Sequence, residues 1–213
     1  MLYSFKGGAD GANPAAGVIR DPTGNLYGTT YSGGAGGAGT VYRLDTNGNE
    51  TVLHSFPLPV DGVFAVAGVI RDSAGNLCGT AQVGGPSNVG VVYRLDAAGH
   101  EAVLHGFTGG ADGGQPFAGV IRDLAGNLYG TTYDGGTSGS GVVYKLDAAG
   151  QEAVLYTFKG GADGGHPCAA VVADAVGNLH GTTYHGGTAG LGVVYKLDVL
   201  YGVMEFVPRH SPP

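Results

Sequence analysis

The sequence has no tryptophan, only two cysteines, and charged side chains at only 13% of its 213 positions. Its 10 basic residues are outnumbered by 17 acidic ones, which gives a formal net charge of −7. This balance disfavours nucleic acid and anionic membranes as partners and favours a cation or a small neutral ligand. No apolar run approaches the roughly 18 residues of a membrane-spanning helix, so we expect no membrane span. Met1 to Phe5 have neither the basic charge nor the length of a signal peptide.

Several catalytic and metal-binding motifs are also missing. The sequence contains no Gly-x-Ser-x-Gly, no His-Glu-x-x-His and no phosphate-binding loop with its lysine. Cys78 and Cys168 are far apart in the chain, and neither is followed by a spacing typical of metal ligands. We therefore expect no disulfide and no cysteine metal site.

Glycine, in contrast, occupies 44 positions. A helical bundle or a doubly wound α/β fold does not tolerate so much glycine inside its elements. Collagen is excluded because the glycines do not recur at every third position. Disorder is disfavoured because 43% of the residues are hydrophobic.

A tandem repeat organises the chain. The tripeptide Gly-Asn-Leu begins at Gly24 and recurs at Gly75, Gly126 and Gly177, which is a constant spacing of 51 residues. The repeat predicts one repeat domain over 1–213, built from four units. The unit boundaries lie at about 6–56, 57–107, 108–158 and 159–207, with 208–213 as a tail.

Each unit contains four short runs rich in Val, Ile, Thr and Tyr, separated by Gly, Asn and Asp. This composition is typical of strands, and no stretch has apolar residues at helical spacing. Because the connections are short, each unit is predicted to be a small antiparallel meander. In the first unit the four runs are Ala16–Arg20, Leu26–Tyr31, Thr40–Asp45 and Glu50–Phe56.

Repeats of this length with four strands each indicate an all-β β-propeller, here with four four-stranded antiparallel blades. Half of a larger dimeric propeller, or a β-solenoid, are the alternatives. Residues 2–5 align with the fourth run of the later units and are a candidate to close the last blade. Tyr201–Val207 is the rival candidate. An unpaired edge left by the surplus segment would favour a homodimer.

The unit Ala-Gly-Val-Ile-Arg-Asp-x-x-Gly-Asn-Leu-Tyr-Gly-Thr-Thr-Tyr-x-Gly-Gly is followed by Gly-Val-Val-Tyr-Lys-Leu-Asp. It resembles the GloVer tandem repeat of bacterial proteins, and the resemblance covers nearly the whole chain. The resemblance implies a repeat architecture and an exported or surface-anchored location. It implies no established chemistry.

One series of aspartates lies in the long connections between units: Asp10, Asp61, Asp112 and Asp163. In a propeller these connections surround the central channel, where four carboxylates would repel one another unless a cation neutralised them. Oxygen ligands on flexible loops suit Ca²⁺, so the series is a candidate calcium site. Capping of the local turns is the alternative.

The fourth unit departs from the repeat at three histidines. His166, His180 and His185 stand where the other units carry other residues. His166 and His185 lie on the two predicted channel-face loops, where either could approach Asp163. A histidine beside a carboxylate and a cation is a candidate general base, so both are predicted catalytic residues. Drift of a degenerate unit is the alternative.

Two functions follow from these patterns. The first is a Ca²⁺-dependent hydrolase of small lactones or esters over the channel, by analogy with larger propeller lactonases. In that case Tyr31, Tyr133 and Tyr184 would line the substrate site. The second is a non-catalytic module that binds carbohydrate or protein through these repeated tyrosines.

Overall fold

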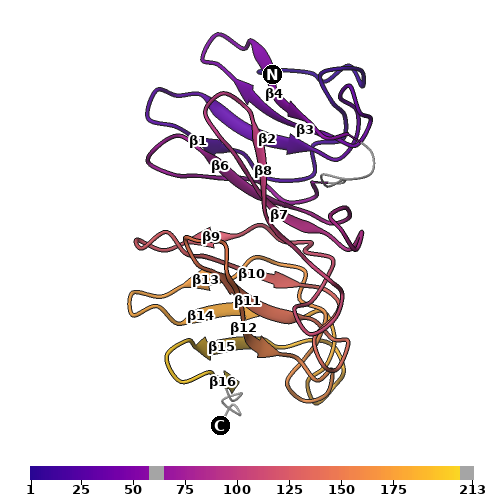
Figure 1. The fold of residues 1–213 in the computed structure, drawn as a ribbon, viewed down its shortest axis with the longest axis vertical. Coiled ribbons are helices and arrows are strands. Elements are labelled where there is room, and N and C mark those ends of the chain that lie inside the picture. Colours follow the sequence, from indigo (N-terminus) through magenta and orange to yellow (C-terminus); the bar gives the residue numbers. More distant parts are fainter. Residues whose placement is uncertain (58–64, 207–213) are drawn as a thin grey trace.

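The computed structural model describes residues 1–57 and 65–206, and within them all regular secondary structure is β. Sixteen strands form four four-stranded antiparallel sheets, each with its strands in chain order. Figure 1 shows the sheets following one another along the long axis of the molecule. The predicted all-β repeat architecture with four four-stranded units is confirmed. The described residues include no helix that is long and apolar enough to cross a membrane.

Each sheet repeats the same strand lengths with small variations. The first strands of the four sheets are β1 (Ile19–Arg20), β5 (Ile70–Arg71), β9 (Ile121–Arg122) and β13 (Val172–Ala173). The second strands are β2 (Leu26–Thr30), β6 (Leu77–Ala81), β10 (Leu128–Thr132) and β14 (Leu179–Thr182). The third strands are β3 (Thr40–Leu44), β7 (Val91–Leu95), β11 (Val142–Leu146) and β15 (Val194–Asp198). The fourth strands are β4 (Glu50–Ser55), β8 (Glu101–Gly106), β12 (Glu152–Thr157) and β16 (Val203–Phe206).

An aspartate closes the turn between the first and second strands of every sheet. The Asp21 carboxylate accepts hydrogen bonds from the backbone N–H of Asn25 at 2.9 Å and from its side-chain amide at 3.0 Å. Gly24 has a φ of +96°, a backbone conformation that favours glycine. The same pair of carboxylate contacts recurs at Asp72, Asp123 and Asp174. The repeated Asp-x-x-Gly-Asn motif is therefore a turn that sets the register of the sheet.

A buried tyrosine on the third strand joins each sheet to the preceding segment. The Tyr144 side chain is fully buried, and its ring lies 5.1 Å from that of Phe107. Opposite it on β10, a Cβ at Gly130 would lie 2.5 Å from the Tyr144 hydroxyl. Glycine is required there because no side chain fits beneath the ring. The corresponding ring pairs are Phe5–Tyr42, Phe56–Tyr93 and Phe158–Tyr195.

Successive sheets meet at three equivalent junctions. Each of the three buried hydrophobic clusters combines side chains of two neighbouring units. Each junction also contains a hydrogen bond from a threonine hydroxyl to an alanine carbonyl 38 residues later in the chain. These bonds are Thr29 to Ala67 at 3.0 Å, Thr80 to Ala118 at 2.9 Å and Thr131 to Ala169 at 3.4 Å.

The row of sheets is curved. The first-to-second-strand turns of the second, third and fourth sheets line one concavity of about 800 Å³. The first and the last sheet lie at opposite ends of the molecule (Figure 1). Within residues 1–57 and 65–206, no buried cluster joins the first sheet to the last. This part of the chain is thus an arc of four propeller-type blades.

The last sheet takes its fourth strand from the C-terminal side of the chain. β16 pairs with β15, from Tyr195 opposite Phe206 to Asp198 opposite Val203. Residues 2–5 form no strand. The ring of Phe5 instead lies 5.0 Å from Tyr42 of the first sheet.

Candidate functional site

The two loops predicted to share a face are in direct contact. In the fourth unit, Gly165 and His185 form an isolated antiparallel bridge, and the backbone N–H of Tyr184 donates to the His166 carbonyl at 3.2 Å. The first and third units repeat the latter bond, from Tyr31 to Asn13 and from Tyr133 to Gln115. The repeat thus brings the connecting loop and the Gly-rich loop together in each of these units.

His166 reaches backwards across the junction between the third and fourth sheets. Its φ is +56°, the left-handed conformation that Asn13 and Gln115 also adopt at the equivalent positions. The ring Nδ1 lies 3.0 Å from the Tyr133 carbonyl oxygen and 3.4 Å from a carboxylate oxygen of Asp134. His166 therefore pairs with a carboxylate of the preceding unit.

Five rings at this junction are in successive contact, and we call this set the junction strip. It consists of Phe117, Tyr133, His166, His185 and Tyr184. Their successive ring centroids lie 5.0, 4.6, 5.6 and 4.6 Å apart. Tyr184 and His185 are exposed, and the other three side chains are half-buried. The structure thus brings the two predicted catalytic histidines together and adds aromatic neighbours on both sides.

The three predicted calcium ligands that the structure describes accept hydrogen bonds from residues shortly before them in the chain. The Asp10 carboxylate accepts from the Tyr3 hydroxyl at 2.9 Å and from the Lys6 N–H at 2.8 Å. Asp163 repeats both bonds, with the Tyr156 hydroxyl and the Lys159 N–H, each at 2.9 Å. Asp112 accepts from the backbone N–H of Thr108 at 2.8 Å and from its hydroxyl. Asp61 lies outside the described residues.

These contacts fit the turn-capping alternative. Among the residues that the structure describes, no group of three or more His, Cys, Asp or Glu is placed to hold a metal ion. The hydrogen bond from the Lys6 backbone holds the pKa of Asp10 below its usual value. Burial and the bond to Asp163 raise the pKa of Tyr156 to about 12, so this phenol remains a donor at neutral pH. A metal role for the series stays a prediction from the sequence.

The three tyrosines predicted to line a substrate site have different surroundings. Tyr184 is exposed, while Tyr31 and Tyr133 are half-buried. Only Tyr133 and Tyr184 belong to the junction strip, one from each side of the third junction. The three tyrosines therefore differ in exposure, and the strip includes two of them.

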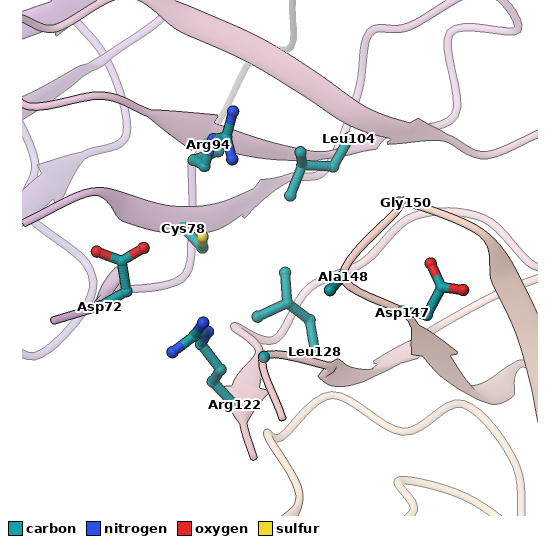
Figure 2. Close-up of a pocket in the computed structure, with 10 residues that line it drawn as sticks. Asp72, Cys78, Arg94, Leu104, Arg122, Leu128, Asp147, Ala148 and Gly150 are labelled. Atoms are coloured by element: carbon teal, nitrogen blue, oxygen red, sulfur yellow. The ribbon is translucent and has the colours of Figure 1, made fainter. Parts of the chain in front are cut away.

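The cysteines are both free, as expected. Cys78 lines a cavity of about 100 Å³ between the second and third sheets, together with Asp72, Arg94 and Arg122 (Figure 2). Burial raises the pKa of the Cys78 thiol to about 11, so it is not a thiolate nucleophile at neutral pH. The cavity has room for only a few water molecules.

Sequence reasoning did not assign Asp134 and Phe117 to a site. Asp134 occupies the repeat position of His185, one unit earlier. That equivalence does not indicate the contact with His166, because the contact joins two packed units. The repeat does not indicate Phe117 either, because no other unit carries an aromatic residue at its position.

Comparison with solved structures identifies propeller-type neighbours. A chain of a nidogen–laminin complex matches with a TM-score of 0.57 and 18% identity over 86% of this chain and 59% of its own. A candidate gluconolactonase has a TM-score of 0.52 and 18% identity, over the same shares of the two chains. A candidate TolB from Agrobacterium tumefaciens has a TM-score of 0.53 and 14% identity, over 88% of this chain and 62% of its own. This chain thus spans less than two thirds of these neighbours, and at such identities they establish the fold alone.

Sequence comparison places the chain in a family. No curated protein sequence matches it. The profile of the Gloeobacter/Verrucomicrobia repeat matches residues 1–123 and 68–210, and these two overlapping matches cover almost the whole chain. The chain therefore belongs to the Gloeobacter/Verrucomicrobia repeat family.

Proposed function

We propose that the protein is a binding module that takes a neutral carbohydrate at the junction strip. The observation that carries the proposal is the unbroken run of five rings across the third junction, from Phe117 to Tyr184. Aromatic rings provide a flat apolar surface and, in tyrosine and histidine, a polar edge. A pyranose has the matching chemistry, with an apolar ring face and a rim of hydroxyl groups.

Polar groups in the strip and beside it support this ligand class. The Asp134 carboxylate accepts hydrogen bonds from hydroxyl groups, while the imidazoles of His166 and His185 can donate or accept them. The net charge of −7 disfavours anionic ligands. Loops held by a rigid β scaffold are a common place for such sites.

Titration with a panel of neutral oligosaccharides, followed by calorimetry, tests the proposal. Tyr133→Ala and Tyr184→Ala should each weaken binding at least about tenfold, because each removes a stacking ring worth about 1.5 kcal/mol. Tyr31→Ala is the matched control, since it removes a tyrosine from the same repeat position in the first unit. An equal loss in Tyr31→Ala, or no binding to any member of the panel, would contradict the proposal.

A second candidate function is hydrolysis of a small lactone or ester. The observation that favours it is the 3.4 Å approach of the His166 ring to Asp134, which could orient the imidazole as a general base toward water. A candidate gluconolactonase is among the structures of similar fold. Asp10, Asp61, Asp112 and Asp163 remain the sequence-based candidates for Ca²⁺ ligands, and the acid–base role of His166 does not depend on that ion.

Hydrolysis of a lactone panel, with and without added Ca²⁺, tests this second candidate. His166→Ala should lower the rate at least about hundredfold if His166 is the base. His100→Ala, which removes a histidine on an exposed turn of the second sheet, is the control. Activity unaffected by EDTA would contradict the calcium role, and the absence of any hydrolysis would contradict the enzyme.

A further inference from the structure

The two ends of the arc expose the two halves of the inter-sheet junction. We define the exit face as Val172, Thr182 and Val194 on the fourth sheet. We define the entry face as the segment Tyr3–Phe5 together with Ala16 and Val18, which precede or flank the first sheet. At the three internal junctions, the residues equivalent to the exit face of one unit pack against those equivalent to the entry face of the next.

The exit-face side chains are more exposed than the equivalent side chains of the first three sheets. Val194 is 64% exposed, whereas its equivalents in the first three sheets are fully buried. These equivalents are Val41, Val92 and Val143. Thr182 is also exposed, whereas the three equivalent threonines are buried and bonded to the next unit.

Val18 and Phe5 of the entry face are likewise more exposed than their equivalents in the later units. Val18 is 49% exposed, while its equivalents Val69, Val120 and Val171 are at most 3% exposed. Phe5 is half-buried, whereas the equivalent phenylalanines, Phe56, Phe107 and Phe158, are fully buried. Each copy of the chain therefore presents one half of a junction at each end.

We propose that the exit face binds the entry face of a second copy of this chain, and that two such junctions close a ring of eight blades. The internal junctions predict the contacts. The Thr29 hydroxyl bonds the Ala67 carbonyl, so by the repeat Thr182 is matched to the Ala16 carbonyl of the second copy. By the same rule, Val194 packs against Val18 and its neighbours. Eight blades lie within the range of propellers.

The edge of β15 provides a second contact. In the first sheet, β3 pairs with β4 at Val41–His54 and Thr40–Ser55. In the last sheet, the pairing that the structure describes runs from Tyr195 opposite Phe206 to Asp198 opposite Val203. Tyr3 and Ser4 correspond by the repeat to His54 and Ser55, so the proposed junction places them beside the start of β15 in the second copy.

The N-terminal segment already has the conformation that this contact needs. The Tyr3 hydroxyl bonds Asp10 at 2.9 Å, just as the Tyr156 hydroxyl bonds Asp163 at 2.9 Å at the end of β12. The Lys6 N–H repeats the bond of the Lys159 N–H to the same aspartates. Tyr3–Phe5 therefore has the contacts of the end of a fourth strand, although it is not part of a sheet.

A second copy fits this surface better than an unrelated partner. A single chain carries both halves of the junction that recurs inside it. The match includes the Thr182–Ala16 hydrogen bond and the position of Tyr3 and Ser4 beside β15. The curvature of the arc brings the first-to-second-strand turns of three sheets around one concavity, which favours a closed ring. In such a ring the second junction forms within one complex, so the two junctions support each other.

Multi-angle light scattering of the 213-residue chain tests the proposal. The mass should be twice 21.2 kDa at micromolar concentration. Val194→Glu and Val18→Glu should each reduce it to 21.2 kDa, with Thr182→Glu as a second exit-face variant. Both valines are exposed within one copy, so these changes should leave the fold intact, as far-ultraviolet circular dichroism can verify. Val103→Glu, at a 44% exposed valine on β8, is the matched control and should retain the double mass.

Mixing the two single variants distinguishes a closed two-copy ring from other dimers. A Val194→Glu chain and a Val18→Glu chain can pair so that both glutamates face each other at one junction, which leaves the other junction wild type. The mixture should therefore recover part of the double mass, although neither variant does so alone. A wild-type monomer, a mass above two copies, or a dimer that persists in both single variants would overturn the proposal.

Discussion

At the scale of single residues, the repeat separates structural side chains from those with a candidate function. The described aspartates that recur in the repeat act as acceptors in turns, as Asp21 does for Asn25. His166 differs because its unit departs from the repeat, and its ring contacts Asp134 across a junction. The repeat pattern alone indicates His166 as a candidate. Its partner could not be predicted, because the contact depends on how two blades pack and not on the spacing within one unit.

Glu152 carries a prediction for pH dependence. Burial, followed by the charge of Asp112, raises its pKa to about 7, from about 4.5 in a solvated chain. Because the folded-state pKa is the higher one, Glu152 favours folding below about pH 4.5, and this contribution is lost as the pH rises through about 7.

Glu152→Gln should therefore stabilise the protein at pH 8 and change little at pH 4. We expect a gain of about 1 kcal/mol in the free energy of unfolding, which is well below the full value of the shift because the side chain is partly solvated. Urea unfolding at the two pH values measures it. A gain of equal size at both pH values would contradict the assignment.

At the scale of elements, the repeat unit predicted the strands well. The Asp-x-x-Gly-Asn turn and the runs rich in Val, Ile, Thr and Tyr mark the same four strands in each unit. The structure has these strands in chain order in every sheet. The ends of the chain were harder to predict. Residues 2–5 and Tyr201–Val207 both fit a fourth strand, and only the pairing of β15 with β16 distinguishes them.

The threonines at the junctions allow a matched comparison. Thr80 is fully buried and donates to the Ala118 carbonyl, so Thr80→Val should reduce the free energy of unfolding by about 1 kcal/mol. Thr182→Val, at the equivalent exposed position, should have no effect on the stability of a single copy.

Urea unfolding in the Val18→Glu background, where we expect no dimer, isolates these effects. Equal losses for Thr80→Val and Thr182→Val would show that Thr182 already has a partner within its own chain. That result would contradict the assignment of the exit face.

At the scale of the whole molecule, four similar blades produce three similar junctions, and the junction strip lies at the third. The junctions follow from the period of 51 residues, because each blade must bury both faces. The strip lies at the third junction because it contains His166 and His185, which differ from the residues at the equivalent positions of the other units. We therefore infer a single asymmetric site.

The number of carbohydrate sites per chain, measured by calorimetric titration with a neutral oligosaccharide, tests this claim most directly. We predict one site per chain, lost in Tyr133→Ala and unchanged in Tyr31→Ala. Three sites of equal affinity, from the first, third and fourth units, would contradict it.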